Sequence, residues 1–154
     1  LILCDTAIPH NSGDIHLNQK EKMNSDVIKN NVKENVRLTY EIRNYLLNGN
    51  LDNFGGSLDK AWQLKKTFSN MISNEYIDSI YDGAIKNGAL GGKLLGAGGG
   101  GFFMFYVPPF EKHNLINYLK SKKLKIQPFR FEQNGLQTWT SRIRNTTSLK
   151  DKAC

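Results

Sequence analysis

The sequence predicts an α+β domain in which helices pack on one face of an antiparallel sheet. Amphipathic helical patterns fill residues 25–88, and short apolar segments typical of strands stand before and after them. Near the end of the chain an Asn-Gly pair separates two alternating segments, which is a signal for an antiparallel hairpin. We expect residues 1–140 to form this one domain and residues 141–154 to be a basic, loosely ordered tail.

The helical patterns have recognisable start and stop signals. Ser25 can cap a first helix, and Gly49 can end it in the left-handed conformation. A second helix is predicted from about Asp52. A third helix can be capped by Ser73 or Asn74 and stops at Gly88. On the first helix the positions predicted to face inward are Ile28, Val32, Val36, Tyr40, the stem of Arg43, and Leu47.

The predicted strands lie at the two ends of the domain. Leu1–Thr6 has the composition of a strand, and the sequence lacks an initiator methionine. We therefore expect this chain to be part of a larger protein. Phe102–Val107 is an apolar strand that Pro108 breaks, and a helix is predicted over about 110–121. Residues 124–132 and 136–140 are predicted to pair as the closing hairpin.

Composition excludes several classes of protein. With 39% hydrophobic and 23% charged residues, the chain suits a folded soluble domain rather than a disordered one. The longest apolar run, residues 102–109, is too short to cross a membrane. The two cysteines, Cys4 and Cys154, stand at opposite ends, which favours a reducing cytoplasm over a disulfide framework.

The net charge of +7 is concentrated at the C-terminal end. Residues 1–119 carry 12 Lys and Arg against 12 Asp and Glu, whereas residues 120–154 carry 9 against 2. Such a basic end can bind nucleic acid, although a solvated surface segment with a frayed tail has the same composition. Phosphorylated substrates would also be attracted to it.

The stretch from Gly88 to Gly101 holds eight of the 14 glycines and leads into the apolar strand. Because glycine loses much conformational freedom on folding, such a run needs a compensating role. Backbone N–H groups without neighbouring side chains can converge on an anion, with Lys93 as an added cation. A ligand-free turn that lets a helix and a strand pack closely is the alternative. The run matches neither the P-loop nor the dinucleotide-binding pattern.

The decapeptide from Gly92 to Gly101, Gly-Lys-Leu-Leu-Gly-Ala-Gly-Gly-Gly-Gly, is similar to the third motif of the GHMP kinases. Residues 58–66, 72–78 and 84–89 resemble the subgroup of D-glycero-D-manno-heptose phosphate kinases and their fucokinase relatives. Residues 128–131 resemble the closing strand of that subgroup. With gaps, the resemblance covers residues 1–140 and implies the ferredoxin-like C-terminal domain of this family.

The resemblance implies an ATP- and Mg²⁺-dependent kinase of a sugar phosphate, with D-glycero-D-manno-heptose 7-phosphate as the expected substrate and surface-polysaccharide heptose as the destination. Phosphoryl transfer depends chiefly on positioning and charge neutralisation. The glycine-loop residues expected near substrate or phosphate are Lys93, Gly96, Ala97, Gly98, Gly99, Gly100 and Gly101.

Four further residues are candidates for substrate binding: His10, Ser12, Asp14 and Lys65. Each has a simpler alternative: His10 as a solvated turn residue, Asp14 as a helix cap and Lys65 as a surface lysine. Residues 5–12 depart from the family pattern, which leaves the exact sugar open. No zinc-ligand pattern is present, and no catalytic base is assigned.

The glycine- and serine-rich ATP loop of GHMP kinases has no counterpart in these 154 residues. We therefore expect an N-terminal half to hold most of the ATP and Mg²⁺, and this chain alone to be inactive. The second hypothesis is a stand-alone module that binds an anion or nucleic acid through the glycine loop and the basic C-terminal end; the family resemblance disfavours nucleic acid.

Overall fold

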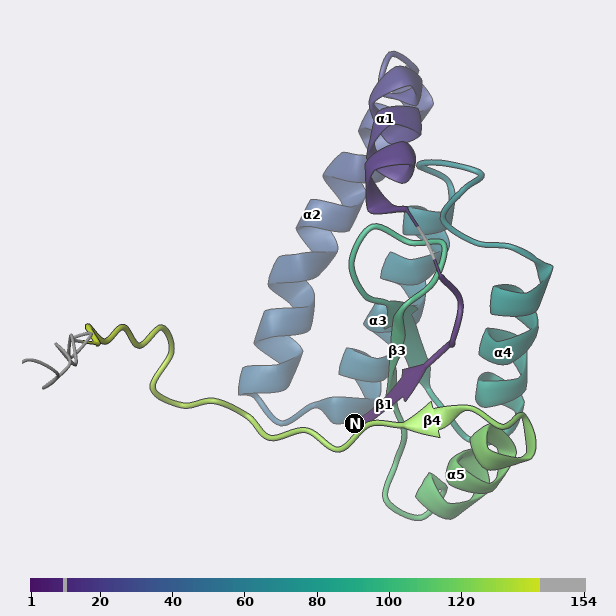
Figure 1. The fold of residues 1–154 in the computed structure, drawn as a ribbon, viewed down its shortest axis with the longest axis vertical. Coiled ribbons are helices and arrows are strands. Elements are labelled where there is room, and N and C mark those ends of the chain that lie inside the picture. Colours follow the sequence, from purple (N-terminus) through teal and green to yellow (C-terminus); the bar gives the residue numbers. More distant parts are fainter. Residues whose placement is uncertain (10, 142–154) are drawn as a thin grey trace, which may run out of the picture.

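The computed structural model describes residues 1–9 and 11–141, which form a four-stranded antiparallel sheet with five helices (Figure 1). The predicted α+β class is confirmed. The sheet has the strand order β2-β3-β1-β4. In chain order the elements are β1 (Ile2–Asp5), α1 (Ser12–Lys22), α2 (Asp26–Leu47), α3 (Leu51–Lys66), α4 (Glu75–Lys86), β2 (Gly91–Leu94), β3 (Phe102–Tyr106), α5 (Lys112–Ser121) and β4 (Lys125–Ile126).

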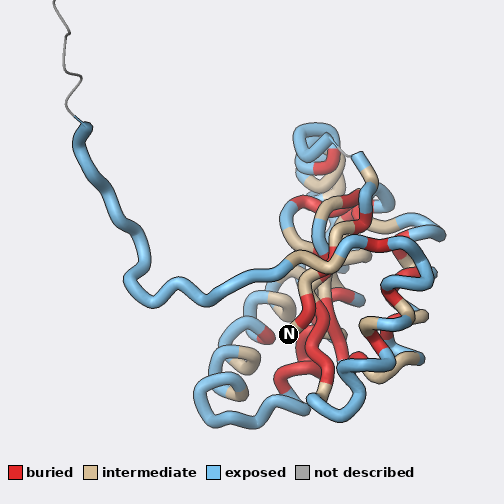
Figure 2. Tube along the Cα trace, turned by 60° about the horizontal axis from the view of Figure 1, so that its bottom comes forward, coloured by how far each residue is buried: buried red, intermediate tan, exposed pale blue. Residues whose placement is uncertain are grey.

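The main core lies on one face of the sheet, under α4 and α5 (Figures 1 and 2). Cys4 pairs with Phe103 across β1 and β3, and both residues are fully buried. The Phe103 ring centroid lies 5.8 Å from that of Trp62 and 5.0 Å from that of Phe105. Because side chains alternate along a strand, the neighbours of these residues point to the opposite face.

Helix α3 lies along β2, at the edge of the sheet, and α2 packs against α3. Trp62 joins the main core, whereas Phe54 and Leu58 form a second cluster with Tyr106. A Cβ atom added to Gly91 would collide with the backbone oxygen of Gly55. The glycines therefore let the helix backbone approach the strand backbone closely.

The predicted inward face of α2 is wrong in part. Val36, Tyr40 and Leu47 are 53%, 66% and 67% exposed, while Leu38 is buried. The amide Nδ2 of Asn35 donates to the backbone oxygen of Ala61 on α3 at 3.0 Å. Since α2 packs mainly against α3, only a narrow stripe of α2 is covered, and Val36, Tyr40 and Leu47 face solvent.

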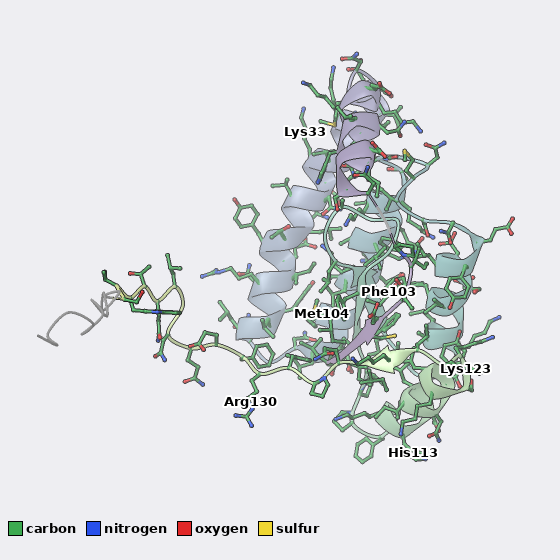
Figure 3. All side chains as sticks on the ribbon, in the orientation of Figure 1. Lys33, Phe103, Met104, His113, Lys123 and Arg130 are labelled. Atoms are coloured by element: carbon green, nitrogen blue, oxygen red, sulfur yellow. The ribbon has the colours of Figure 1, made fainter. Side chains whose placement is uncertain are left out.

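Two further predictions differ from the structure. Helix α1 is not among the predicted helices; its cap residue is Asn11, whose Oδ1 accepts from the N–H of Gly13 at 3.0 Å. The predicted C-terminal hairpin is wrong, because only residues 125–126 form a strand, this strand pairs with β1, and residues 127–141 contain no helix or strand. Figure 2 shows that this C-terminal segment leaves the body and is exposed from residue 128 onward, and Figure 3 places Arg130 on it. The tail 142–154 lies outside the described residues.

Candidate functional site

The glycine loop is shorter than predicted, because β2 takes up residues 91–94 of the glycine-rich stretch. The loop proper runs from residue 95 to residue 101 and joins β2 to β3. The N–H of Leu95 donates to the oxygen of Phe102 at 2.8 Å, which closes the base of the loop. The edge strand and the central strand β3 therefore fix both ends of this loop.

Three other parts of the chain hold the loop between its ends. The N–H of Thr6, just after β1, donates to Gly101 O at 2.8 Å. The N–H of Gly99 donates to Ile72 O at 2.8 Å in the connection between α3 and α4. Gln19 Nε2 on α1 reaches Ala97 O at 3.5 Å. The loop is thus held in one conformation from several sides.

The loop glycines have different roles. Gly98 has φ +123°, and a Cβ there would lie 2.8 Å from the Cα of Ile72, so this position supports the close-packing alternative. Gly96 has φ +74°, but an added Cβ would meet nothing within 4 Å. Gly96 is therefore needed for its backbone conformation, and the space beside it is open.

Two lysines flank the first half of the loop. Lys65 Nζ, at the end of α3, donates to Leu94 O at 3.2 Å and also to Gly96 O. Burial, together with the nearby charge of Lys93, lowers the pKa of Lys65 to about 8. Burial also lowers the pKa of Lys93. By contrast, Lys66 forms an ion pair with Asp78 at 3.2 Å.

The other candidates lie apart from these contacts. Ser12 and Asp14 are exposed in the first turn of α1, where Asp14 Oδ2 accepts from Asn11 Nδ2 at 2.8 Å. Asn11 is the cap of this helix and Asp14 lies in its first turn; no contact of Ser12 or Asp14 with the loop is recorded in the described part. His10 lies outside the described residues.

Sequence reasoning missed three residues that hold the loop: Thr6, Gln19 and Ile72. Thr6 is 1% exposed although it is polar, but burial is invisible in a single sequence. Gln19 could be found only after α1 had been recognised, and Ile72 contributes a backbone oxygen, which has no sequence signal at all.

Within residues 1–9 and 11–141, no three His, Cys, Asp or Glu side chains gather in a way that could hold a metal ion. We therefore assign no metal ligand. A search of the same residues finds no helix with the length and apolar character needed to span a membrane.

Comparison with known proteins shows which families the chain is similar to. The family model "GHMP kinases C terminal" matches residues 42–125, from the second half of α2 to the start of β4. The D-glycero-alpha-D-manno-heptose 7-phosphate kinase of Campylobacter jejuni is 32% identical over 90% of this chain and 41% of its own length. A bifunctional fucokinase/GDP-fucose pyrophosphorylase of Arabidopsis thaliana is 30% identical over 56% of this chain and 8% of its own length.

The fold is also that of a solved kinase. The crystal structure of L. major mevalonate kinase in complex with R-mevalonate matches with a TM-score of 0.67 and 20% identity, over 79% of this chain and 37% of that chain. This chain thus spans less than half the length of each of these relatives. Because the family model matches more than half of the residues, the chain belongs to the GHMP kinase family and carries its C-terminal domain.

Proposed function

We propose that this chain is the C-terminal part of an ATP-dependent kinase that phosphorylates D-glycero-D-manno-heptose 7-phosphate. The observation that carries the proposal is the 32% identity over 90% of the chain to a protein named for that reaction. A match over 138 of the 154 residues includes the glycine loop, which makes the loop end of the sheet the candidate for contact with the reactants. The product would serve the synthesis of surface-polysaccharide heptose in the cytoplasm.

The chain's contribution to such a reaction is positioning and charge. The loop offers backbone N–H groups, Lys65 and Lys93 offer cations, and neither needs to react covalently. Mg²⁺, when bound, would neutralise the phosphate charge, but no ligand for it is assigned in this chain. We propose that an N-terminal half supplies the metal site and most of the ATP contacts, as the length of the relatives suggests.

The test is a kinase assay on the full-length protein. We expect ADP release with ATP and heptose 7-phosphate, little with the unphosphorylated heptose, and none with mevalonate or homoserine. A protein that responded only to mevalonate or homoserine would contradict the choice of substrate.

The same assay on the isolated chain tests whether the proposed N-terminal half is needed for turnover. We expect no turnover, because half of a catalytic site cannot orient both reactants. Metal-dependent ADP release by the isolated chain would overturn this expectation. Tight binding of RNA or DNA by a full-length protein without kinase activity would instead favour the stand-alone binding module.

A further inference from the structure

Strand β4 is short, but its pairing with β1 continues past its end. The N–H of Gln127 donates to the oxygen of Leu3 at 2.8 Å, which keeps the register in which Cys4 pairs with Ile126. In an antiparallel pair, each step forward along one strand matches one step back along the other. Gln127 and Leu3 form a hydrogen-bonded pair, so the positions on either side of them are non-hydrogen-bonded pairs.

The same register extends to the first residue of the sequence. It sets Pro128 opposite Ile2 and Phe129 opposite Leu1. Pro128 falls at a non-hydrogen-bonded position, where the backbone nitrogen points away from β1. Because β4 is the edge strand of the sheet, the N–H that proline lacks would have met no neighbouring strand there. Pro128 is therefore compatible with a ladder that continues beyond it.

The residues after Pro128 have the properties of a strand that lacks a partner. Phe129 and Phe131 alternate with Arg130 and Glu132, and the two ring centroids lie 5.6 Å apart. Side chains two residues apart meet in this way when they share one face of an extended chain. Both rings are exposed, and Figure 1 shows the segment running past the N-terminus and away from the body. Unpaired backbone groups in such a segment favour pairing with another strand.

The start of β1 has space for such a strand. A cavity of about 470 Å³ lies there, and Leu1, Ile116 of α5, Phe129 and Phe131 are among the residues that line it. The α-amino group of Leu1 is itself partly buried: burial, and then the charge of Lys112, lower its pKa. This environment disfavours a charged amine, whereas the neutral N–H of a peptide bond carries no such cost.

We propose that residues 129–132 form an edge strand against the polypeptide that directly precedes Leu1 in the longer protein. Strands β1 and β4 then continue beyond the sheet as one antiparallel ribbon, and this ribbon joins the chain to its N-terminal half. The inference rests on the proposed function, in which an N-terminal half precedes this chain. The register of β1 and β4 identifies the partner of this strand, which the resemblance of residues 128–131 to a closing strand leaves open.

The ribbon has a backbone signature with a period of two residues. The N–H groups of Phe129 and Phe131 face β1 and its extension, whereas those of Arg130 and Glu132 point to the open edge. In the full-length protein, hydrogen exchange followed by NMR should be at least about tenfold slower at the first two amides than at the second two. In the isolated chain at low concentration, the Phe131 amide should exchange as fast as its two neighbours, because its partner is missing.

Proline variants of the full-length protein provide matched controls. Phe131→Pro removes an N–H that faces the partner strand, whereas Arg130→Pro removes one that faces the edge, as Pro128 does in the native sequence. Each is compared with alanine at the same position, which removes the side chain alone. Exchange at the Phe129 amide should be about tenfold faster in Phe131→Pro than in Phe131→Ala, because a neighbouring ladder hydrogen bond is lost. Arg130→Pro should match Arg130→Ala.

Equal exchange at all four amides of residues 129–132 in the full-length protein would overturn the proposed ribbon, as would equal sensitivity to proline at the two positions. Slow exchange in the isolated chain that becomes slower with concentration would assign the strand to a second copy and would also overturn it. An inactive full-length protein with alternating protection would refute the proposed kinase but keep the ribbon. An active kinase with uniform exchange over these residues would refute the ribbon alone.

Discussion

The glycine loop and the C-terminal segment 127–141 are both irregular stretches attached to the same sheet, and they differ in what surrounds them. The loop contains little apolar surface, yet α1, α3, β1 and the connection before α4 all hold it. The C-terminal segment carries Phe131, Leu136 and Trp139 at 77%, 93% and 85% exposure (Figure 2). Contacts with neighbouring elements therefore order an irregular segment more effectively than the hydrophobicity of the segment itself.

The largest expected effect comes from disturbing the packing of the loop. Gly98→Val in the full-length protein should lower the free energy of unfolding by about 2–4 kcal/mol, because a Cβ meets the backbone of Ile72 at a positive φ. Gly96→Ala is the matched control, since it strains only φ and should cost about 1–2 kcal/mol. Urea denaturation measures both values; equal losses would show that packing against Ile72 is unimportant.

A smaller effect is expected from the lysine that holds the start of the loop. The pKa of Lys65 is about 8 in the folded chain against an ordinary value of 10.5, so between these values the unfolded state binds more protons. The free energy of unfolding should therefore rise with pH across this window, by on the order of 2 kcal/mol. Below pH 8 Lys65 is protonated in both states, so the full free-energy cost of burying its charge remains.

Lys65→Met should flatten that rise relative to the wild type, whereas Lys60→Met should not. Denaturation curves from pH 7 to 10.5 provide the measurement. Lys93 is the charged group recorded as acting on Lys65, so Lys93→Met should flatten the rise in part. Identical pH profiles for the wild type and Lys65→Met would contradict the buried environment assigned to this lysine.

The smallest effect on stability is expected in the C-terminal segment. Replacing Phe131 and Trp139 by Ser should change the free energy of unfolding by less than about 0.5 kcal/mol, because both are exposed. The isolated chain is expected to self-associate through exposed apolar surface, and the double variant should do so less. Sedimentation over a concentration series decides this. A large loss of stability would mean that the segment packs on the domain in solution.

Much of the fold could be predicted from residues with local signals. Helix α4 begins after Asn74, one of its two predicted caps, whose Oδ1 accepts from the N–H of Ile77 at 2.9 Å. Helix α2 ends at Leu47, and Gly49 follows with φ +68°. Strand β2 was not predicted because its Gly-Gly start is atypical of strands. Gly91 lies against the backbone of α3 and Gly92 against Phe105, and these tertiary contacts have no signal in the sequence.

Only the part of the candidate site that lies within one short stretch of sequence was predictable. The glycine motif identified the loop, and Lys93 lies within it, but the contact between Lys65 and the loop spans about thirty residues of chain. The prediction of a C-terminal hairpin was wrong for the opposite reason. Its Asn-Gly turn and alternating residues are genuine local signals. However, only residues 125–126 of the predicted strands form a strand, which pairs with β1, and residues 128–141 are exposed.

The burial of Cys4 has a practical consequence. Its thiol is fully enclosed on the central strand β1, and burial, with a contribution from Asp5, raises its pKa to about 11. A thiol reagent at neutral pH can react only when β1 separates from its neighbours. In a Cys154→Ser background, the rate at which Cys4 is labelled would report how often the sheet opens. The rate can be compared with and without a bound phosphate.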